Sequence, residues 1–366
     1  MRSHRKLVAI TLLLLFLLLP TSFLSFSAAA SFSIDPMFSI VWITDTQCLS
    51  ERLPLNFDKL CNWIVDYSDL LNIKAVIHTG DIVEHPSSTI EWIRANHSMS
   101  ILLNNNIPYC WDAGNHDLLP TTWHGRNFTA FNTAIMQQKG YWISDKFDGE
   151  NTAIHFKASD WDFLLINVEF QPKLAVLLWV KHLLELYPMY HTIIATHAYL
   201  NGTGEHEKWT NDFDEPYFEQ ILATHSNVFM TLNGHFMIGN RTSRTFIGNH
   251  HELFFNYQQT DGGQGDSRIR ILTFSKKEDT IIVNTVNTVT NQFMADPENK
   301  FTLDIPFFEN PVATENLNAT KSYSAESQPK TLSVAFPILI SILSVFSFVI
   351  TRKKMRKTPN VEPEPS

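Results

Sequence analysis

The sequence predicts an α/β fold, and three features of the chain lead to this prediction. Apolar runs of strand length alternate with helical patterns from Phe38 onwards. A polar residue of a kind that binds metal ions follows most of these runs. Beyond residue 244 the chain changes to short alternating runs, which indicate antiparallel strands that close a second face. One globular unit is expected, because 366 residues with 44% hydrophobic content can bury a large core.

The individual elements follow from the spacing of apolar residues. The first predicted helix, at 55–71, has apolar side chains three and four positions apart, which is typical of an amphipathic helix. Other helices are expected at 89–103, 173–186 and 217–225. Strands are expected at 38–44, 75–78, 107–111, 163–168, 192–196, 228–232, 245–247, 253–257, 269–274 and 280–286. Residues 127–161 have no clear period and are predicted to be an irregular insertion that borders the site.

Both ends of the chain predict an exported, membrane-anchored protein. Residues 1–30 have a basic start, an apolar stretch and three closing alanines, which is typical of a signal peptide; an uncleaved anchor is the alternative. Residues 332–350 are long and apolar enough to cross a bilayer, and the basic residues after them indicate a cytoplasmic tail at 351–366. A stalk is expected at 305–331, so the domain at 38–304 would lie on the extracytoplasmic side of a single-pass membrane protein.

Charge and cysteine content argue against two classes of protein. A net charge of −9 without a basic run in the body argues against stable nucleic-acid binding, because phosphate backbones are held mainly by clustered Lys and Arg. Three cysteines are too few for a disulfide framework, and Cys61 and Cys110 lie in apolar runs typical of a core. Sequons that fit a glycoprotein begin at Asn96, Asn127, Asn201, Asn240 and Asn318.

A set of polar side chains stands at the ends of the predicted strands. The crevice beyond the carboxyl ends of such strands is where ligands bind, so these side chains are expected to converge. Carboxylate, amide and imidazole groups together suit Mn, Fe or Zn. Each residue alone has a structural explanation, such as a turn cap or a hydrogen-bonded core histidine, but the ordered set favours a metal site. The set consists of Asp45, Gln47, Asp81, Asn115, His116, His197 and His235.

The order and spacing of this set resemble the calcineurin-like metallophosphoesterase superfamily. The signature of that superfamily runs Asp-x-His, Gly-Asp, Gly-Asn-His-Asp/Glu, His and Gly-His-x-His, and the match spans roughly residues 38–304. Its most specific part here is Gly114-Asn115-His116-Asp117. The resemblance implies a four-layer αββα sandwich of two mixed sheets flanked by helices. Exported members that begin Thr-Asp-Thr-Gln, as residues 44–47 do, look like the nearest relatives.

The resemblance also implies a role for each residue. Asp81 would bridge two divalent ions, of Mn, Fe or Zn. Asn115, His197 and His235 would complete one ion, with Asp45 and Gln47 on the other. His116 would protonate the leaving group, and Glu84, three residues after Asp81, would orient it. The implied activity is hydrolysis of a phosphomonoester or phosphodiester substrate by a metal-activated water molecule.

Two departures from the signature affect the same metal. Gln47 stands where the first motif has histidine, and Met237 stands where the last motif has its second histidine. Weaker binding of that ion is expected unless Asn240, His250 or His251 replaces the lost ligands. The alternative function is therefore a surface binding module that keeps one metal and has reduced catalysis. His85 occupies a position where protein phosphatases often have arginine, so protein dephosphorylation is not favoured.

Overall fold

The computed structural model describes residues 37–119, 131, 133–147, 149–206, 215–237, 239–260 and 267–305. The predicted signal peptide, stalk, membrane span and tail lie outside these residues, apart from Ile305. None of the helices in the described ranges is both long and apolar enough to cross a membrane.

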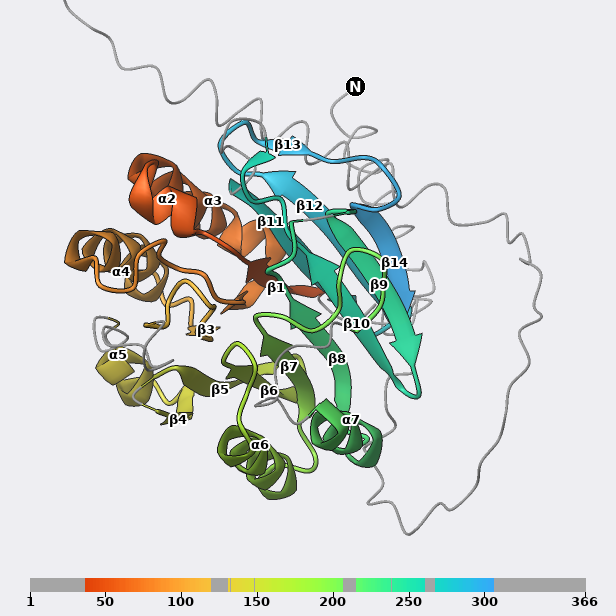
Figure 1. Ribbon diagram of the computed structural model, residues 1–366. Coiled ribbons are helices and arrows are strands. Elements are labelled where there is room, and N and C mark those ends of the chain that lie inside the picture. Colours follow the sequence, from red (N-terminus) through yellow and green to blue (C-terminus); the bar gives the residue numbers. More distant parts are fainter. Residues whose placement is uncertain are drawn as a thin grey trace, which may run out of the picture. The chain divides into compact units, whose positions relative to one another are not determined.

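The first of two seven-stranded sheets is mixed (Figure 1). Its order is β13-β12-β11-β1-β2-β3, and β14 pairs with β12. β1, β2 and β3 run parallel, whereas β11 is antiparallel to β1 with Trp42 opposite Arg270. Its strands are β1 (Phe38–Ile43), β2 (Ile73–His78), β3 (Tyr109–Trp111), β11 (Arg268–Ser275), β12 (Thr280–Asn287), β13 (Gln292–Phe293) and β14 (Lys300–Asp304).

The second sheet is also mixed, with the order β4-β5-β6-β7-β8-β10-β9. β6, β7, β8 and β10 run parallel, so their carboxyl ends share one edge. Its strands are β4 (Trp142–Lys146), β5 (Asn151–Ala158), β6 (Trp161–Val168), β7 (His191–Thr196), β8 (Val228–Asn233), β9 (Thr242–Ile247) and β10 (His250–Phe255).

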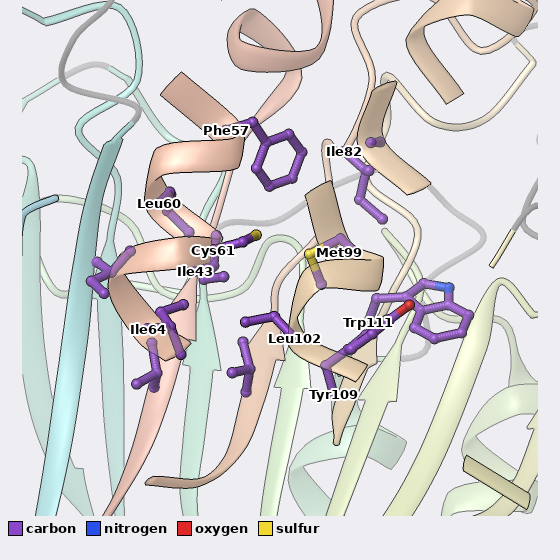
Figure 2. Packing of buried hydrophobic residues seen from close by; sticks show 14 of the residues in the cluster. Ile43, Phe57, Leu60, Cys61, Ile64, Ile82, Met99, Leu102, Tyr109 and Trp111 are labelled. Atoms are coloured by element: carbon purple, nitrogen blue, oxygen red, sulfur yellow. The ribbon is translucent and has the colours of Figure 1, made fainter. Parts of the chain in front are cut away.

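Three layers of buried apolar side chains hold the sheets and helices together. Phe38, Ile40 and Trp42 of β1 pack between the two sheets, whereas Val41 and Ile43 belong to the cluster under α3 and α4 (Figure 2). A third cluster joins α6 and α7 to the second sheet. The four-layer αββα sandwich is thus confirmed. The helices are α2 (Gln47–Glu51), α3 (Pro54–Leu71), α4 (Thr89–Asn104), α5 (Thr133–Gln138), α6 (Leu174–Leu186) and α7 (Glu215–Thr224).

Most predicted elements are present with shifts of one to three residues at their ends, but one prediction is wrong, and α2, β13 and β14 were not predicted. Residues 127–161 are not an irregular insertion, because their described part contains α5, β4, β5 and the start of β6. Both faces of β5 are largely buried, which removes the alternation that reveals a strand. The short helix α2, which begins at Gln47, was not predicted. Cys61 and Cys110 are buried, as expected, and Cys48 is buried too.

Candidate metal centre

The candidate ligands meet at the edge where the parallel strands of both sheets end. Asp45 follows β1, Asp81 follows β2, and Asn115 lies in the loop after β3. His197 and His235 follow β7 and β8 of the other sheet. The Nδ1 atom of His197 donates to the main-chain oxygen of Thr79 at 2.8 Å, which ties the two edges together.

Three of these residues have an unusual backbone conformation. Asp45, Asp81 and His235 have φ angles of 50°, 52° and 75°, in the left-handed region that non-glycine residues rarely adopt. Such conformations cost free energy and cluster at functional sites, where the surrounding structure enforces them. The chain therefore turns sharply after each strand and directs the polar side chain back to the shared edge.

Two glycines allow the loops to come this close. A Cβ atom at Gly114 would collide with the main-chain nitrogen and the carboxylate of Asp81, lying 2.8 Å from its Cγ atom. A Cβ atom at Gly234 would likewise collide with Thr44 and Asp45. The glycines of the Gly-Asn-His and Gly-His motifs are thus explained by backbone packing against the two carboxylates.

Gly114→Ala should therefore disturb the centre and the fold together. We expect the free energy of unfolding to fall by about 1–3 kcal/mol, because a methyl group is forced into a filled site. Denaturant titration measures this loss, and calorimetry measures metal uptake. Gly140→Ala is the control, because no atom lies within 4 Å of a Cβ there and only its positive φ opposes the change. Equal metal uptake in both variants would contradict this interpretation.

Three potential ligand atoms converge on His197 Nε2. It lies 3.1 Å from Asn115 Oδ1, 3.3 Å from Asp81 Oδ1 and 3.0 Å from His235 Nδ1. Since His197 Nδ1 donates to Thr79, Nε2 is the atom of this ring that would bind a metal ion in place of a proton. A set of acceptors that face one another fits a cation at their centre. Asp81, His197 and His235 also form a group whose ligand atoms lie within 4.8 Å of one another.

The electrostatics of this group lead to the same conclusion. Burial alone would lower the pKa of His197, but the Asp81 carboxylate overrides burial and raises it to about 10. Burial would raise the pKa of Asp81, but His197 lowers it to about 2. Burial and the charge of His197 lower the pKa of His235 to about 3, so that ring stays neutral, as a metal ligand must. The site strongly attracts one positive charge.

Gln47 lies at the other oxygen of Asp81, and Asp45 lies beside the main chain of His235. Gln47 Nε2 donates to Asp81 Oδ2 at 2.9 Å, whereas Asp81 Oδ1 faces His197. The Asp45 carboxylate accepts from the main-chain N–H of His235 at 3.1 Å and from the Thr44 hydroxyl. Burial raises the pKa of Asp45 to about 7 against the charge of His197, and the charge of Asp81 adds to this rise. Two buried carboxylates this close also favour a cation.

His116 and Glu84 form a pair at the open side of the centre. His116 Nδ1 lies 3.5 Å from Glu84 Oε1 and 3.3 Å from the Glu84 main-chain oxygen. The ring is partly exposed, with 37% of its side chain accessible. Burial opposes protonation, but the charges of Asp81 and Glu84 outweigh it and raise the pKa of His116. A raised pKa favours the protonated form, and an accessible imidazole in that form can donate a proton.

Three supporting residues were assigned no role from the sequence. Asp117 accepts the main-chain N–H groups of Ile82, Val83 and Gly114 at 2.9–3.0 Å, which fixes the loops after β2 and β3. The ring centroid of Phe170 lies 5.3 Å from that of His235, and the buried Glu169 precedes it. Glu169 directly follows β6, so the rule that polar residues end the strands would have found it.

The proposed substitutes for the lost ligands are engaged elsewhere. His250 Nε2 bonds to Glu252 at 3.1 Å, and His251 Nε2 bonds to the Asp304 main-chain oxygen at 3.0 Å. Both lie at the start of β10, the end of that strand remote from the candidate centre. Asn240 is exposed in a surface groove whose lining includes none of the candidate ligands.

Comparisons with known proteins agree with this geometry. The sequence matches the family described as calcineurin-like phosphoesterase over residues 38–239. The uncharacterized protein YvnB of Bacillus subtilis (strain 168) is 30% identical over 269 residues, which cover 68% of this chain and 20% of that protein. This chain thus spans about a fifth of the length of that curated relative.

Two solved structures are similar at low sequence identity. Purple acid phosphatase PPD1 from yellow lupin seeds has 13% identity and a TM-score of 0.49, covering 74% of this chain and 54% of that one. GAP50, the anchor in the inner membrane complex of Plasmodium, has 11% identity and a TM-score of 0.43, covering 75% and 90%. Because the family match extends over more than half of the sequence and contains every candidate ligand, the chain belongs to the calcineurin-like phosphoesterase family.

Proposed function

We propose that this protein is a metal-dependent phosphoric ester hydrolase that cleaves a phosphomonoester or phosphodiester. The observation that carries the proposal is the arrangement around Asp81. One carboxylate oxygen faces His197 and the other faces Gln47, as a bridging ligand requires. The candidate proton donor His116 is joined to the same carboxylate, because its main-chain N–H donates to Asp81 Oδ1 at 2.9 Å.

Family membership implies divalent metal ions as cofactors, and the donor set fits them. Asn115, His197 and His235 would hold one ion with Asp81, and Asp45 with Gln47 would hold the other. When bound, such ions neutralise phosphoryl charge and activate water for attack on phosphorus. The buried Gln47 Oε1 has no hydrogen-bond partner among the described residues, and a buried acceptor of this kind is suited to bind a cation.

The other residues of the chain would prepare and complete the reaction. The ring of Phe170 packs on the rings of His197 and His235 and excludes water from one side of them. The charges of Asp81 and Glu84 raise the pKa of His116, which favours this side chain as the proton donor to the leaving oxygen. Glu91 accepts the main-chain N–H groups of Glu84 and His85 at 2.9 Å, which holds the Glu84 loop beside His116.

The direct test uses purified full-length protein, loaded in turn with Mn²⁺, Fe²⁺ and Zn²⁺. We expect hydrolysis of p-nitrophenyl phosphate or bis(p-nitrophenyl) phosphate, loss of activity with a chelator and recovery when metal is restored. Absence of turnover with all three metals and both esters would overturn the proposal.

Glu84→Gln tests the assignment of His116 as an acid. The Glu84 charge raises the pKa of His116, so removing it should lower that pKa. The decline of activity towards alkaline pH should then begin at a lower pH than in the wild type, because His116 loses its proton at a lower pH. The pH profile of kcat/KM measures this shift of the alkaline limb. Glu278→Gln, at a side chain that is 65% exposed, is the control and should leave the limb in place. An unmoved limb in Glu84→Gln would contradict the assignment.

A second candidate function is a metal-containing surface binding module with reduced catalysis. The observation that favours it is the loss of histidine at Gln47 and Met237 on one side of Asp81. This function predicts tight binding of a phosphate ester with little or no turnover. Calorimetry and the activity assay on the same metal-loaded sample separate the two functions.

We also propose that the domain is exported and anchored by the apolar segment at 332–350. The signal-like start and the basic residues after this segment support the proposal. Protease treatment of intact cells should remove the domain and leave a small protected fragment with the tail. A domain protected until the cells are lysed would contradict this location.

A further inference from the structure

We propose that the two halves of the candidate centre differ in metal chemistry. The half formed by Asp45, Asp81 Oδ2 and Gln47 Oε1 contains oxygen ligands alone, and it would bind a hard, exchangeable cation such as Mg²⁺ or Mn²⁺. The half formed with His197 and His235 would retain a borderline metal such as Zn²⁺. This inference rests on the proposed two-metal function and adds the identity and exchangeability of the ions.

The first supporting observation is the division of the Asp81 carboxylate. Its Oδ1 atom lies 3.3 Å from His197 Nε2 on the nitrogen-rich side. Its Oδ2 atom accepts from Gln47 Nε2 at 2.9 Å on the other side. The two carboxylate oxygens of Asp81 therefore face different chemical environments.

The second observation is the unsatisfied oxygen of Gln47. The side chain is almost fully buried, with 1% of the residue exposed, and Oε1 has no hydrogen-bond partner among the described residues. Nε2 is fixed on a carboxylate, so the amide orientation is chemically determined and Oε1 is the acceptor that remains. A buried acceptor without a donor costs free energy, which binding of a cation or its water would recover.

The third observation is that no described imidazole completes this half. Met237, at the position of the second histidine in the motif, is 43% exposed. His78 Nε2 bonds to the Thr46 hydroxyl at 2.8 Å. Its buried Nδ1 atom has no hydrogen-bond partner among the described residues, but the ring belongs to no described group of three ligand residues whose atoms lie within 4.8 Å of one another. His250 and His251 are bonded to other partners at the far end of β10. Nitrogen ligands, which favour zinc over magnesium, are thus confined to the other half.

Hydrogen bonds hold the carboxylate of Asp45 in place in the half that has oxygen ligands alone. A hydrogen-bond chain runs from Trp42 Nε1 to Thr79 Oγ1 at 3.0 Å, from Thr79 to Thr44 at 2.7 Å, and from Thr44 to Asp45. Magnesium-type sites typically use one or two carboxylates together with water and substrate phosphate. Binding at this half should therefore be weak without phosphate and stronger with it.

Metal counting and Mn²⁺ titration of the full-length protein test the inference. After loading with excess Zn²⁺ and gel filtration, the wild type should retain about one equivalent, held by the histidine half. Electron paramagnetic resonance of added Mn²⁺ should then detect a second site, at least ~10-fold weaker than a histidine-ligated site, displaced by Mg²⁺ and strengthened by inorganic phosphate. Asp45→Asn should abolish this Mn²⁺ site and leave the retained zinc unchanged.

Introducing the two histidines of the family signature tests the same inference through a gain of zinc binding. Gln47→His combined with Met237→His should raise the retained zinc to about two equivalents. Gln47→Glu is the second variant in case the double variant does not fold, and it should bind Mn²⁺ more tightly than the wild type. Thermal unfolding checks that each variant is folded.

Three outcomes would overturn the inference. These are retention of two equivalents of zinc by the wild type, absence of a Mn²⁺ site, and a Mn²⁺ site that survives Asp45→Asn. Because none of these readouts needs turnover, they are independent of the proposed function. A protein that hydrolyses phosphate esters with two tightly held zinc ions would refute this inference alone, whereas Mn²⁺ binding without any turnover would refute the proposed function alone.

Discussion

Asp81→Asn is expected to lower kcat/KM by about 10³-fold or more and to prevent stable metal binding. A decrease of 10³ corresponds to about 4 kcal/mol of transition-state stabilisation, which is the scale of a metal ion that neutralises phosphoryl charge. Both oxygens of Asp81 serve the centre, one towards His197 and one towards Gln47. An amide would keep the shape but remove the charge and one acceptor.

The fold should survive this substitution better than the activity does. An asparagine oxygen can still accept the main-chain N–H of His116, and the weaker repulsion of Asp45 offsets part of the lost attraction to His197. Kinetics, metal analysis and thermal unfolding of the same preparation separate loss of the site from loss of the fold. Asp69→Asn removes the same charge from an exposed position of α3 and is the control. Unchanged metal content in Asp81→Asn would contradict the bridging role.

His116→Gln is expected to lower kcat by about 10²–10⁴-fold for an ester with a poor leaving group. An alkoxide needs a proton as it leaves, whereas a nitrophenolate leaves without one. The decrease should therefore be much smaller for nitrophenyl esters than for alkyl esters. The main-chain N–H of His116 still donates to Asp81, so the metal site itself should remain.

Rates for paired alkyl and nitrophenyl esters measure the effect, with metal content as the check on the site. His97→Gln replaces a histidine whose side chain is 72% exposed on α4, and it should change neither rate. Equal decreases for both esters in His116→Gln would exclude proton donation and indicate a different role for this side chain.

Much of the fold could be predicted because the pattern of apolar residues follows the secondary structure. The helix expected at 55–71 is α3 (Pro54–Leu71), whose apolar face packs on the first sheet. It begins with proline and ends at Asn72 in a left-handed conformation, and both are common at helix ends. The five-residue helix α2 was missed because it is too short to show a period.

The convergence of the site could be predicted, but the contacts within it could not. Parallel strands bring their carboxyl ends to one edge, so residues that follow β1 and β2 lie near one another, as do those that follow β7 and β8 in the other sheet; packing of the two sheets brings the two edges together. Which atoms face each other depends on side-chain directions and loop geometry. The bond from Gln47 to Asp81 and the three main-chain donors to Asp117 are examples that spacing alone does not reveal.

The most direct test of a metal centre at Asp81 is anomalous X-ray scattering from crystals of the protein grown with Zn²⁺ and Mn²⁺. We expect a zinc peak among Asp81, Asn115, His197 and His235, with manganese on the Asp45 side of the same carboxylate. Crystals that show no metal peak within bonding distance of Asp81 would contradict it.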